Sequence, residues 1–217
     1  ASRFQLDLKA VQTHWSARTK GLMTATPSNP TGTSVPAAEL AAICDWARQH
    51  HAWRIVDEIY LNLSDADANG QPAQTVLAAD PDAIVINSFS KYFGMTGWRL
   101  GWAIVPEAMV PVMERLAQNY YICASTPTQM AALACFTPES LAVCEARKAE
   151  FAARRALVLD GLAQARLPVP VLPDGAFYVY IDVSQTGLDA MQFCQRALAE
   201  AHVALTPGYD FGPCSGA

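Results

Sequence analysis

The most informative stretch of the sequence is residues 88–101, where a lysine stands among hydroxyl and guanidinium donors. Lys91 follows an apolar run typical of a buried strand, where lysine is rare unless it has a task. Ser88 and Ser90 precede it, and Arg99 follows eight residues later. Hydroxyls and guanidinium groups bind phosphate oxygens, and an amine beside fixed positive charge can attack a carbonyl to form a Schiff base. The alternative is a strand-end loop whose lysine faces water.

Two further polar clusters follow two other apolar runs. Asn29-Pro30-Thr31-Gly32 comes after the run at 22–26, and Asp57-Glu58-Ile59-Tyr60 comes after the run at 53–56. Taken singly, the first cluster is typical of a simple turn and the second of an exposed strand end. In α/β sheets, however, ligands bind at the carboxyl ends of the strands. The order of the three clusters therefore favours one shared site.

The elements that must position these clusters alternate between strand-like and helix-like patterns. Strands are expected at 22–26, 53–56, 83–86 and 100–105, and helices at 34–50, 107–120 and 126–136. Ser34 is the expected N-cap of the first helix, with Pro36 near its first turn. This alternation predicts an α/β fold with a mainly parallel sheet flanked by helices.

The pattern changes after residue 136. A long helix is expected at 138–165, then strands at 169–171, 177–181 and 203–205, with a helix at 188–201. These elements predict a smaller α+β domain. We therefore divide the chain into a large domain at 1–136 and a small domain at 137–217, which opens with the long helix as connector.

Composition narrows the functional classes. The 217 residues are 52% hydrophobic and 16% charged, which is typical of a folded chain and excludes intrinsic disorder. The formal net charge is −5 and no basic stripe stands out, so no nucleic-acid partner is expected. No run of 18 apolar residues indicates a membrane span.

The six cysteines carry no metal-binding pattern. They stand at positions 44, 123, 135, 144, 194 and 214. None forms a Cys-x-x-Cys pair, and no histidine lies at zinc-ligand spacing from two of them, so no metal site is expected. We interpret them as buried thiols in a reducing cytoplasm.

The three strand-end clusters together resemble the class I/II aminotransferases, pyridoxal-phosphate enzymes of the aspartate-aminotransferase fold (fold type I). The lysine block, Ser88-Phe-Ser-Lys91 to Arg99-Leu-Gly, is the most specific part of the resemblance. The segments 173–178 and 207–212 are also similar to small-domain segments of that family. The resemblance implies an enzyme that transfers an amino group between an amino acid and a 2-oxo acid, with pyridoxal 5′-phosphate as cofactor.

The resemblance also implies roles for individual residues. Lys91 would hold the cofactor as a Schiff base and, once released by substrate, would carry a proton. Asp57 would face the pyridine nitrogen and keep it protonated. Tyr60 and Asn29 would hydrogen-bond the phenolic oxygen of the ring.

The phosphate group has its own set of implied ligands. Ser88 and Arg99 would bind it, with Arg99 acting through its forked guanidinium. Ser90 is a secondary candidate. Because the active site of this family is shared across a dimer, the resemblance also implies a homodimer.

The family pattern is incomplete in this chain. The helix N-terminus and the stacking aromatic residue that precede the first strand in the family have no counterpart, and no arginine follows Arg196 to bind a substrate carboxylate. We therefore interpret the sequence as a fragment of an aminotransferase, and we expect the isolated chain to be catalytically poor.

Three other interpretations remain open from the sequence. A lyase or a decarboxylase would use the same Lys91 and Asp57. A non-catalytic regulatory domain of the same fold could bind the cofactor next to a DNA-binding module encoded upstream. A plain α/β domain without a cofactor would leave the three strand-end clusters unexplained.

Overall fold

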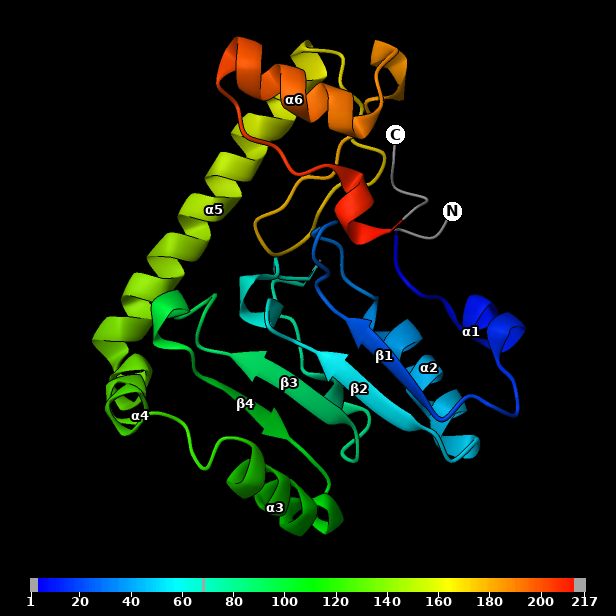
Figure 1. Cartoon of the computed structure of the whole chain (residues 1–217), viewed down its shortest axis with the longest axis vertical. Helices are drawn as coiled ribbons and strands as arrows, with labels where there is room; N and C mark the ends of the chain where they lie inside the picture. Colours follow the sequence, from blue (N-terminus) through cyan, green and yellow to red (C-terminus); the bar gives the residue numbers. More distant parts are fainter. Residues whose placement is uncertain (1–3, 68, 213–217) are drawn as a thin grey trace.

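The computed structural model describes residues 4–67 and 69–212. Its sheet has four strands in the order β1-β2-β3-β4. They are β1 Gly21–Ala25, β2 Trp53–Asp57, β3 Ile84–Ser88 and β4 Gly101–Ile104 (Figure 1). The first three are parallel, whereas β4 runs antiparallel to β3. The predicted α/β fold with a mainly parallel sheet is confirmed.

Helices surround and extend the sheet. They are α1 Leu8–His14, α2 Ala37–Gln49, α3 Val110–Tyr120, α4 Thr126–Leu133, α5 Pro138–Gln164 and α6 Ala190–Ala201. The expected helices all form, and α1 is an addition that its short length concealed. The expected cap at Ser34 is wrong, because the N-cap of α2 is Pro36 and the Ser34 N–H donates instead to Asp174 Oδ1 at 2.8 Å.

The main core lies on one face of the sheet. Val56 of β2 and Val85 of β3 are 1% exposed and pack against Ile43 of α2, with Val11 of α1 in the same cluster. Burial of such side chains is the main source of stability in a domain of this kind. Leu22 of β1 packs against this core, whereas the next residue, Met23, points to the other face of the sheet and is 75% exposed. The core therefore joins the sheet to α1 and α2 and fixes the three parallel strands as one platform.

A buried ion pair links β2 to the turn before β3. Arg54 Nε donates to Asp80 Oδ2 at 2.7 Å and Nη2 donates to Oδ1 at 3.0 Å. The side chains are 11% and 3% exposed. The hydrogen bond that Arg54 donates to Asp80 raises the pKa of Arg54, so the guanidinium stays charged. Each buried charge therefore relies on the other for its stabilisation.

The prediction of strands in the C-terminal part of the chain is wrong. No strand forms at 169–171, 177–181 or 203–205, all of which lie within the described residues. A strand needs a neighbouring strand, and within the described residues none pairs with these segments. The loop just before 177–181 bonds instead to the turn after β1. The N–H groups of Asp174 and Gly175 both donate to Gly32 O, at 2.9 and 3.0 Å. Beyond the sheet, the described chain is helix and loop.

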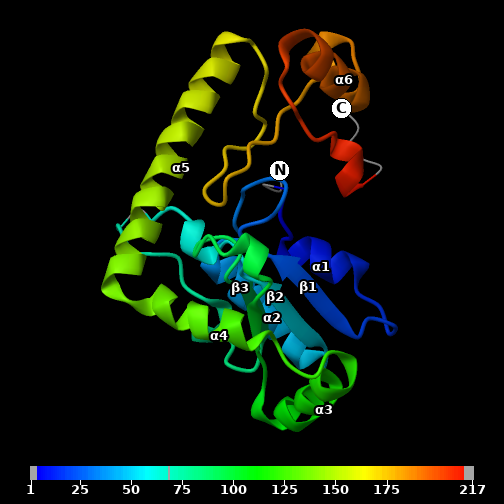
Figure 2. The same ribbon diagram turned by 60° about the vertical axis from the view of Figure 1, so that its left-hand side comes forward.

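This contact seats the loop at 173–178 against the turn that follows β1. Gly32 has a φ of 66° and no room for a side chain, because a Cβ there would lie 2.8 Å from Tyr178 O and from Pro173 Cβ. Both views show the loop returning from the end of α5 to the carboxyl ends of the parallel strands (Figures 1 and 2). The sheet edge and the distal loop therefore form one surface.

The long helix α5 connects the platform of parallel strands to residues 165–212, called here the distal part. It extends from the sheet toward α6 (Figures 1 and 2). The Tyr92 hydroxyl donates to Glu145 Oε1 at 2.5 Å, and Arg155 Nη2 binds both oxygens of Asp65 at 2.6 Å. These bonds tie α5 to the segments that follow β2 and β3. Although α5 has 27 residues, neither it nor any other helix of the described ranges is long and apolar enough to cross a membrane.

Removal of one partner of the buried pair should destabilise the fold. We expect Asp80→Ala to lower the free energy of unfolding by about 3–5 kcal/mol, since the Arg54 charge would remain buried without a counterion. Urea denaturation monitored by circular dichroism measures this loss. Asp45→Ala is the matched control, because it breaks the exposed Arg48–Asp45 pair, whose loss should cost within about 0.5 kcal/mol. Equal losses in the two variants would contradict the prediction.

Candidate active site

The candidate site lies at the carboxyl edge of the parallel strands. Asp57 is the last residue of β2, Lys91 stands in the turn after β3, and Asn29 stands in the turn after β1. Because β1, β2 and β3 are parallel neighbours, their ends reach the same edge. The three clusters that the sequence placed after separate strands therefore occupy one edge of the sheet.

Lys91 lies between two aromatic rings. Its Nζ is 5.6 Å from the ring centroid of Tyr60 and 5.6 Å from that of Phe177. The turn that carries it is closed by a hydrogen bond from Gly94 N to Lys91 O at 3.0 Å. Within the described ranges no carboxylate forms an ion pair with Lys91. The amine is thus held by ring faces, whose attraction for a cation is modest, and is available to a reactant.

Tyr60 follows β2 and is 3% exposed. Its hydroxyl oxygen lies 2.5 Å from that of Tyr178. Burial raises the pKa of Tyr60 most strongly, and the negative charge of Asp57 raises it further. The phenol therefore keeps its proton and can serve as a hydrogen-bond donor.

The adjacent carboxylates Asp57 and Glu58 have different environments. Glu58 is 2% exposed, and its Oε1 accepts a hydrogen bond from Val76 N at 2.6 Å. Burial raises the pKa of Glu58 despite this bond. Asp57 is only partly buried, and its Oδ1 accepts a bond from Ile59 N at 3.0 Å. Glu58 thus fastens the chain at Val76, whereas Asp57 retains acceptor capacity at the sheet edge.

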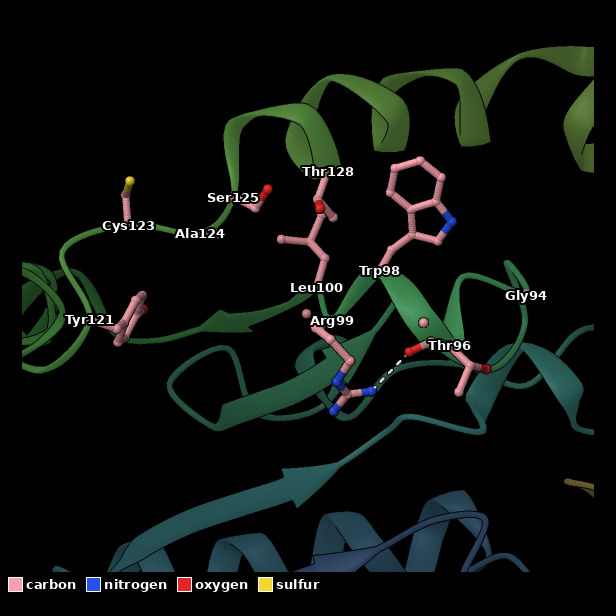
Figure 3. A pocket seen from close by; sticks show the side chains of 12 residues that line it. Gly94, Thr96, Trp98, Arg99, Leu100, Tyr121, Cys123, Ala124, Ser125 and Thr128 are labelled. Carbon is pink, nitrogen blue, oxygen red and sulfur yellow. Dashed lines mark hydrogen bonds between the residues drawn. The ribbon is translucent and has the colours of Figure 1, made fainter.

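Arg99 stands at the opposite side of the lysine turn, just before β4. It has a left-handed φ of 55° and an exposed side chain, whose Nη1 donates to Thr96 O at 3.0 Å. Thr96 is itself anchored through Oγ1 to Ser90 O at 2.6 Å. Figure 3 shows Arg99 extending from this turn with its bond to Thr96. In the part of the chain that the structure describes, Arg99 has no carboxylate partner.

An open cavity of about 870 Å³ adjoins Arg99. Its lining includes the turn from Gly94 to Gly101, and Ser125 and Thr128 at the start of α4 (Figure 3). Hydroxyl groups and a guanidinium without a counterion make this region suited to an anion.

Ser88 is engaged within the protein. Its Oγ donates to Leu100 O at 3.1 Å and accepts from Ser90 N at 3.0 Å, which closes the turn around Lys91. Ser90 is 8% exposed. A hydroxyl whose proton is bound to a carbonyl would have to rotate before it could donate to phosphate, so this role of Ser88 stays a prediction.

The distal loop adds two residues that the sequence analysis did not assign to the site. Phe177 and Tyr178 line a cavity of about 430 Å³ together with Asn29, which is exposed. Phe177 packs edge-on to Tyr60, with ring centroids 5.5 Å apart. The available signal was the aromatic pair in the segment 173–178, but its contact with Tyr60 depends on how the loop is seated at Gly32.

Comparison with known proteins identifies the family of the chain. A family model for aminotransferase class I and II matches residues 1–216. The chain is 43% identical over 199 residues to a valine–pyruvate aminotransferase of Mycobacterium tuberculosis, covering 91% of this chain and 50% of the relative. It is 33% identical over 212 residues to an aspartate aminotransferase of Pyrococcus abyssi, covering 97% of this chain and 54% of the relative.

A solved structure gives the same result. The crystal structure of an aminotransferase from Mycobacterium tuberculosis matches with a TM-score of 0.92 and 39% identity, over 99% of this chain and 55% of the other. The chain thus spans about half the length of the curated relatives it matches. Since the family model extends over residues 1–216, the chain belongs to the class I and II aminotransferase family.

Proposed function

We propose that the protein to which this chain belongs is a pyridoxal-phosphate-dependent aminotransferase that moves an amino group between an amino acid and a 2-oxo acid. The observation that carries the proposal is the placement of Lys91 Nζ, 5.6 Å from the Tyr60 ring centroid, at a sheet edge that also ends in Asp57. Aminotransferases of class I and II use pyridoxal phosphate.

The chemistry of the side chains fits that cofactor. Arg99 offers a cation without a counterion among the described residues, as a phosphate requires. Lys91 offers an amine for the aldehyde carbon. Asp57 retains acceptor capacity, as binding of a protonated pyridine nitrogen requires. The site therefore has one suitable group for each reactive part of the cofactor.

The bound cofactor supplies an electron sink for the α-carbon of the amino acid. Lys91 would first bind the cofactor through Nζ and, once the substrate amine has replaced it, would carry a proton from the α-carbon on the same nitrogen. The Asp57 carboxylate would keep the pyridine nitrogen protonated, so that the ring accepts negative charge. The two residues thus divide proton transfer and charge stabilisation.

The remaining predicted residues would orient the ring. Tyr60, whose raised pKa keeps its hydroxyl protonated, would donate to the phenolic oxygen, and Asn29 would bind the same oxygen from the turn after β1. Arg99 would bind the phosphate, with Ser88 joining after rotation of its hydroxyl. These contacts would fix the plane in which the substrate bond is broken.

Amino-group transfer is favoured over the other reactions that this scaffold supports. The named relatives are a valine–pyruvate and an aspartate aminotransferase, which use different amino acids but share the reaction type. We therefore assign transamination rather than a lyase, a decarboxylase or a regulatory role, with an amino acid and a 2-oxo acid as substrates.

We also propose two domains, 1–136 and 137–217. The four strands all precede residue 136, and within the described residues nothing after α4 adds to the sheet. The connector α5 carries the chain away from the platform. The second domain would supply Phe177 and Tyr178 to the site.

Apolar side chains on α3, α4 and the turn between them support a homodimer. The exposed members are Val110, Val112, Met113, Leu116, Tyr120, Tyr121, Ile122, Met130 and Leu133. Tyr120 is 82% exposed and Ile122 is 78% exposed. Exposed apolar side chains gathered on neighbouring elements mark interaction sites. We propose that this surface, named here the α3–α4 surface, pairs with a second copy of the protein.

The state of the thiols supports a cytoplasmic location. The five cysteines within the described residues are free, whereas Cys214 lies outside them. Burial, helped by the charge of Asp80, raises the pKa of Cys44 to about 11, so that this thiol stays protonated and unreactive. The expectation that the thiols are buried holds for Cys44, Cys135 and Cys144 but is wrong for Cys123, which is exposed, and Cys194 is only partly buried. Free thiols are typical of proteins in a reducing compartment.

Borohydride trapping tests the cofactor assignment. After incubation with pyridoxal phosphate and reduction, we expect one stoichiometric adduct on Lys91, because its amine has no ion-pair partner and lies at the site. Peptide mass spectrometry locates the adduct. Lys9, Lys20 and Lys148 are the other lysines of the chain and serve as internal controls. Labelling spread over these three, in both the chain and the full-length protein, would contradict the assignment.

Neutralisation of Asp57 separates charge stabilisation from binding. We expect Asp57→Asn in the full-length enzyme to lower kcat by about 100-fold or more, because the pyridine nitrogen loses its anionic partner. The Lys91 adduct should still form, since the phosphate contacts are intact. Asp82→Asn, at an exposed position before β3, should leave kcat unchanged. A kcat above one tenth of the wild-type value in Asp57→Asn would argue against the assigned role.

A charge placed in the α3–α4 surface should weaken the dimer. We expect the protein to be a dimer by multi-angle light scattering and Leu116→Asp to shift it toward monomer, because a carboxylate would be buried at the interface. Leu157→Asp is the control, since Leu157 is 73% exposed on α5. A monomeric wild-type protein, or equal dissociation of both variants, would refute the proposal.

A further inference from the structure

The contact between Tyr60 and Tyr178 joins parts of the chain that lie 118 positions apart. The two hydroxyl oxygens are 2.5 Å apart, and the rings meet edge to face with centroids 5.5 Å apart at 80°. Tyr60 comes from the platform, whereas Tyr178 comes from the loop after α5. The contact is therefore where the distal loop reaches the candidate site.

Tyr178 is held in place by the backbone around it. Two residues before it, Ala176 is 4% exposed and belongs to the same buried cluster as Tyr60. Further back, Asp174 N and Gly175 N donate to Gly32 O. A Cβ on Gly175 would lie 2.6 Å from Pro27 Cγ, so the loop is closely packed there. The position of the Tyr178 hydroxyl is thus set by contacts that do not involve that hydroxyl.

The direction of this hydrogen bond follows from the number of protons. A phenol has one O–H proton and two acceptor lone pairs. If Tyr60 donates its proton to the phenolic oxygen of the cofactor, as the proposed function has it, the proton between the two tyrosines must come from Tyr178. A hydroxyl that accepts a hydrogen bond becomes polarised and donates more strongly itself.

We propose, on the basis of the proposed function, that Tyr178 is a positioning residue that acts on the cofactor through Tyr60. It holds the Tyr60 hydroxyl in place and strengthens the bond that this hydroxyl donates to the phenolic oxygen. This arrangement involves no proton transfer, because Tyr178 and Tyr60 each remain protonated.

The effect on the bound cofactor has a definite sign. By donating to the phenolic oxygen, Tyr60 would draw negative charge away from the Lys91 nitrogen that holds the cofactor, and that charge would otherwise stabilise the protonated form of this nitrogen. Loss of the Tyr178 hydroxyl weakens that donation, so the nitrogen should hold its proton to higher pH.

Spectrophotometric titration of the full-length enzyme with bound cofactor tests the inference. We expect Tyr178→Phe to raise the pKa of the absorbance transition by about half a unit to one unit, the size of one neutral hydrogen bond. Tyr180→Phe is the matched control, because Tyr180 carries the same hydroxyl two residues further on and packs against Phe4, with ring centroids 5.7 Å apart. The control should titrate as the wild type does.

A double-mutant cycle isolates the route through Tyr60. Tyr60→Phe should itself raise the pKa, and Tyr178→Phe added to it should produce no further shift. An equal additional shift in the Tyr60→Phe background would show that Tyr178 acts elsewhere and would overturn the inference. An unshifted titration in Tyr178→Phe alone would overturn it as well.

A measurement without the cofactor gives a second test. In protein labelled with ¹³C at the hydroxyl-bearing carbon of tyrosine, the Tyr60 signal is assigned by its loss in Tyr60→Phe. It should move in Tyr178→Phe and stay in Tyr180→Phe; no movement in Tyr178→Phe overturns the inference. Absence of a Lys91 adduct in the wild-type enzyme would overturn the proposed function and this inference with it, whereas a normal adduct with an unshifted titration would overturn only the inference.

Discussion

Parallel pairing of β1, β2 and β3 is the constraint on which the site depends. Parallel neighbours end on one side, so a turn, a carboxylate and a lysine that are dozens of positions apart in the chain become neighbours along one edge. The core of Val56 and Val85 against α2 holds the strands in this register, and the Arg54–Asp80 pair fixes β2 to the start of β3. The position of Lys91 thus depends on packing against α2 and on an ion pair that do not themselves contact the lysine.

The electrostatics of the edge follow from unequal burial. Glu58 and Tyr60 are buried and have raised pKa values, whereas Asp57, the last residue of β2, is only partly buried. Arg99, which is exposed, and Lys91, which is half-buried between two rings, have no carboxylate partners in the described part of the chain. An anionic ligand that also carries an electrophilic carbon would satisfy both cations, which is the combination that an aldehyde phosphate offers.

The platform could be predicted from the sequence because its signals are local. Apolar runs ending in Asp57 and Ser88 mark strands, and strand order alone brings Asn29, Asp57 and Lys91 to one edge. The distal part could not be predicted in this way. The run at 177–181 has the alternation of a strand, yet its preceding backbone bonds Gly32 instead of a neighbouring strand. Ser34 likewise looks like a helix cap, but α2 begins only after Pro36, and the Ser34 N–H donates to Asp174, 140 positions away. Both outcomes depend on contacts between distant segments, which a local pattern does not contain.

The way in which the loop at 173–178 is attached has a consequence for the evolution of such a site. The loop is fastened by N–H groups of Asp174 and Gly175 and by the carbonyl of Gly32, and these main-chain groups do not depend on the side chains at 177 and 178. Mutation can therefore replace the side chains at 177 and 178 while the loop keeps its position. The side chains beside the lysine can therefore diverge between proteins of this fold while the backbone around them is retained.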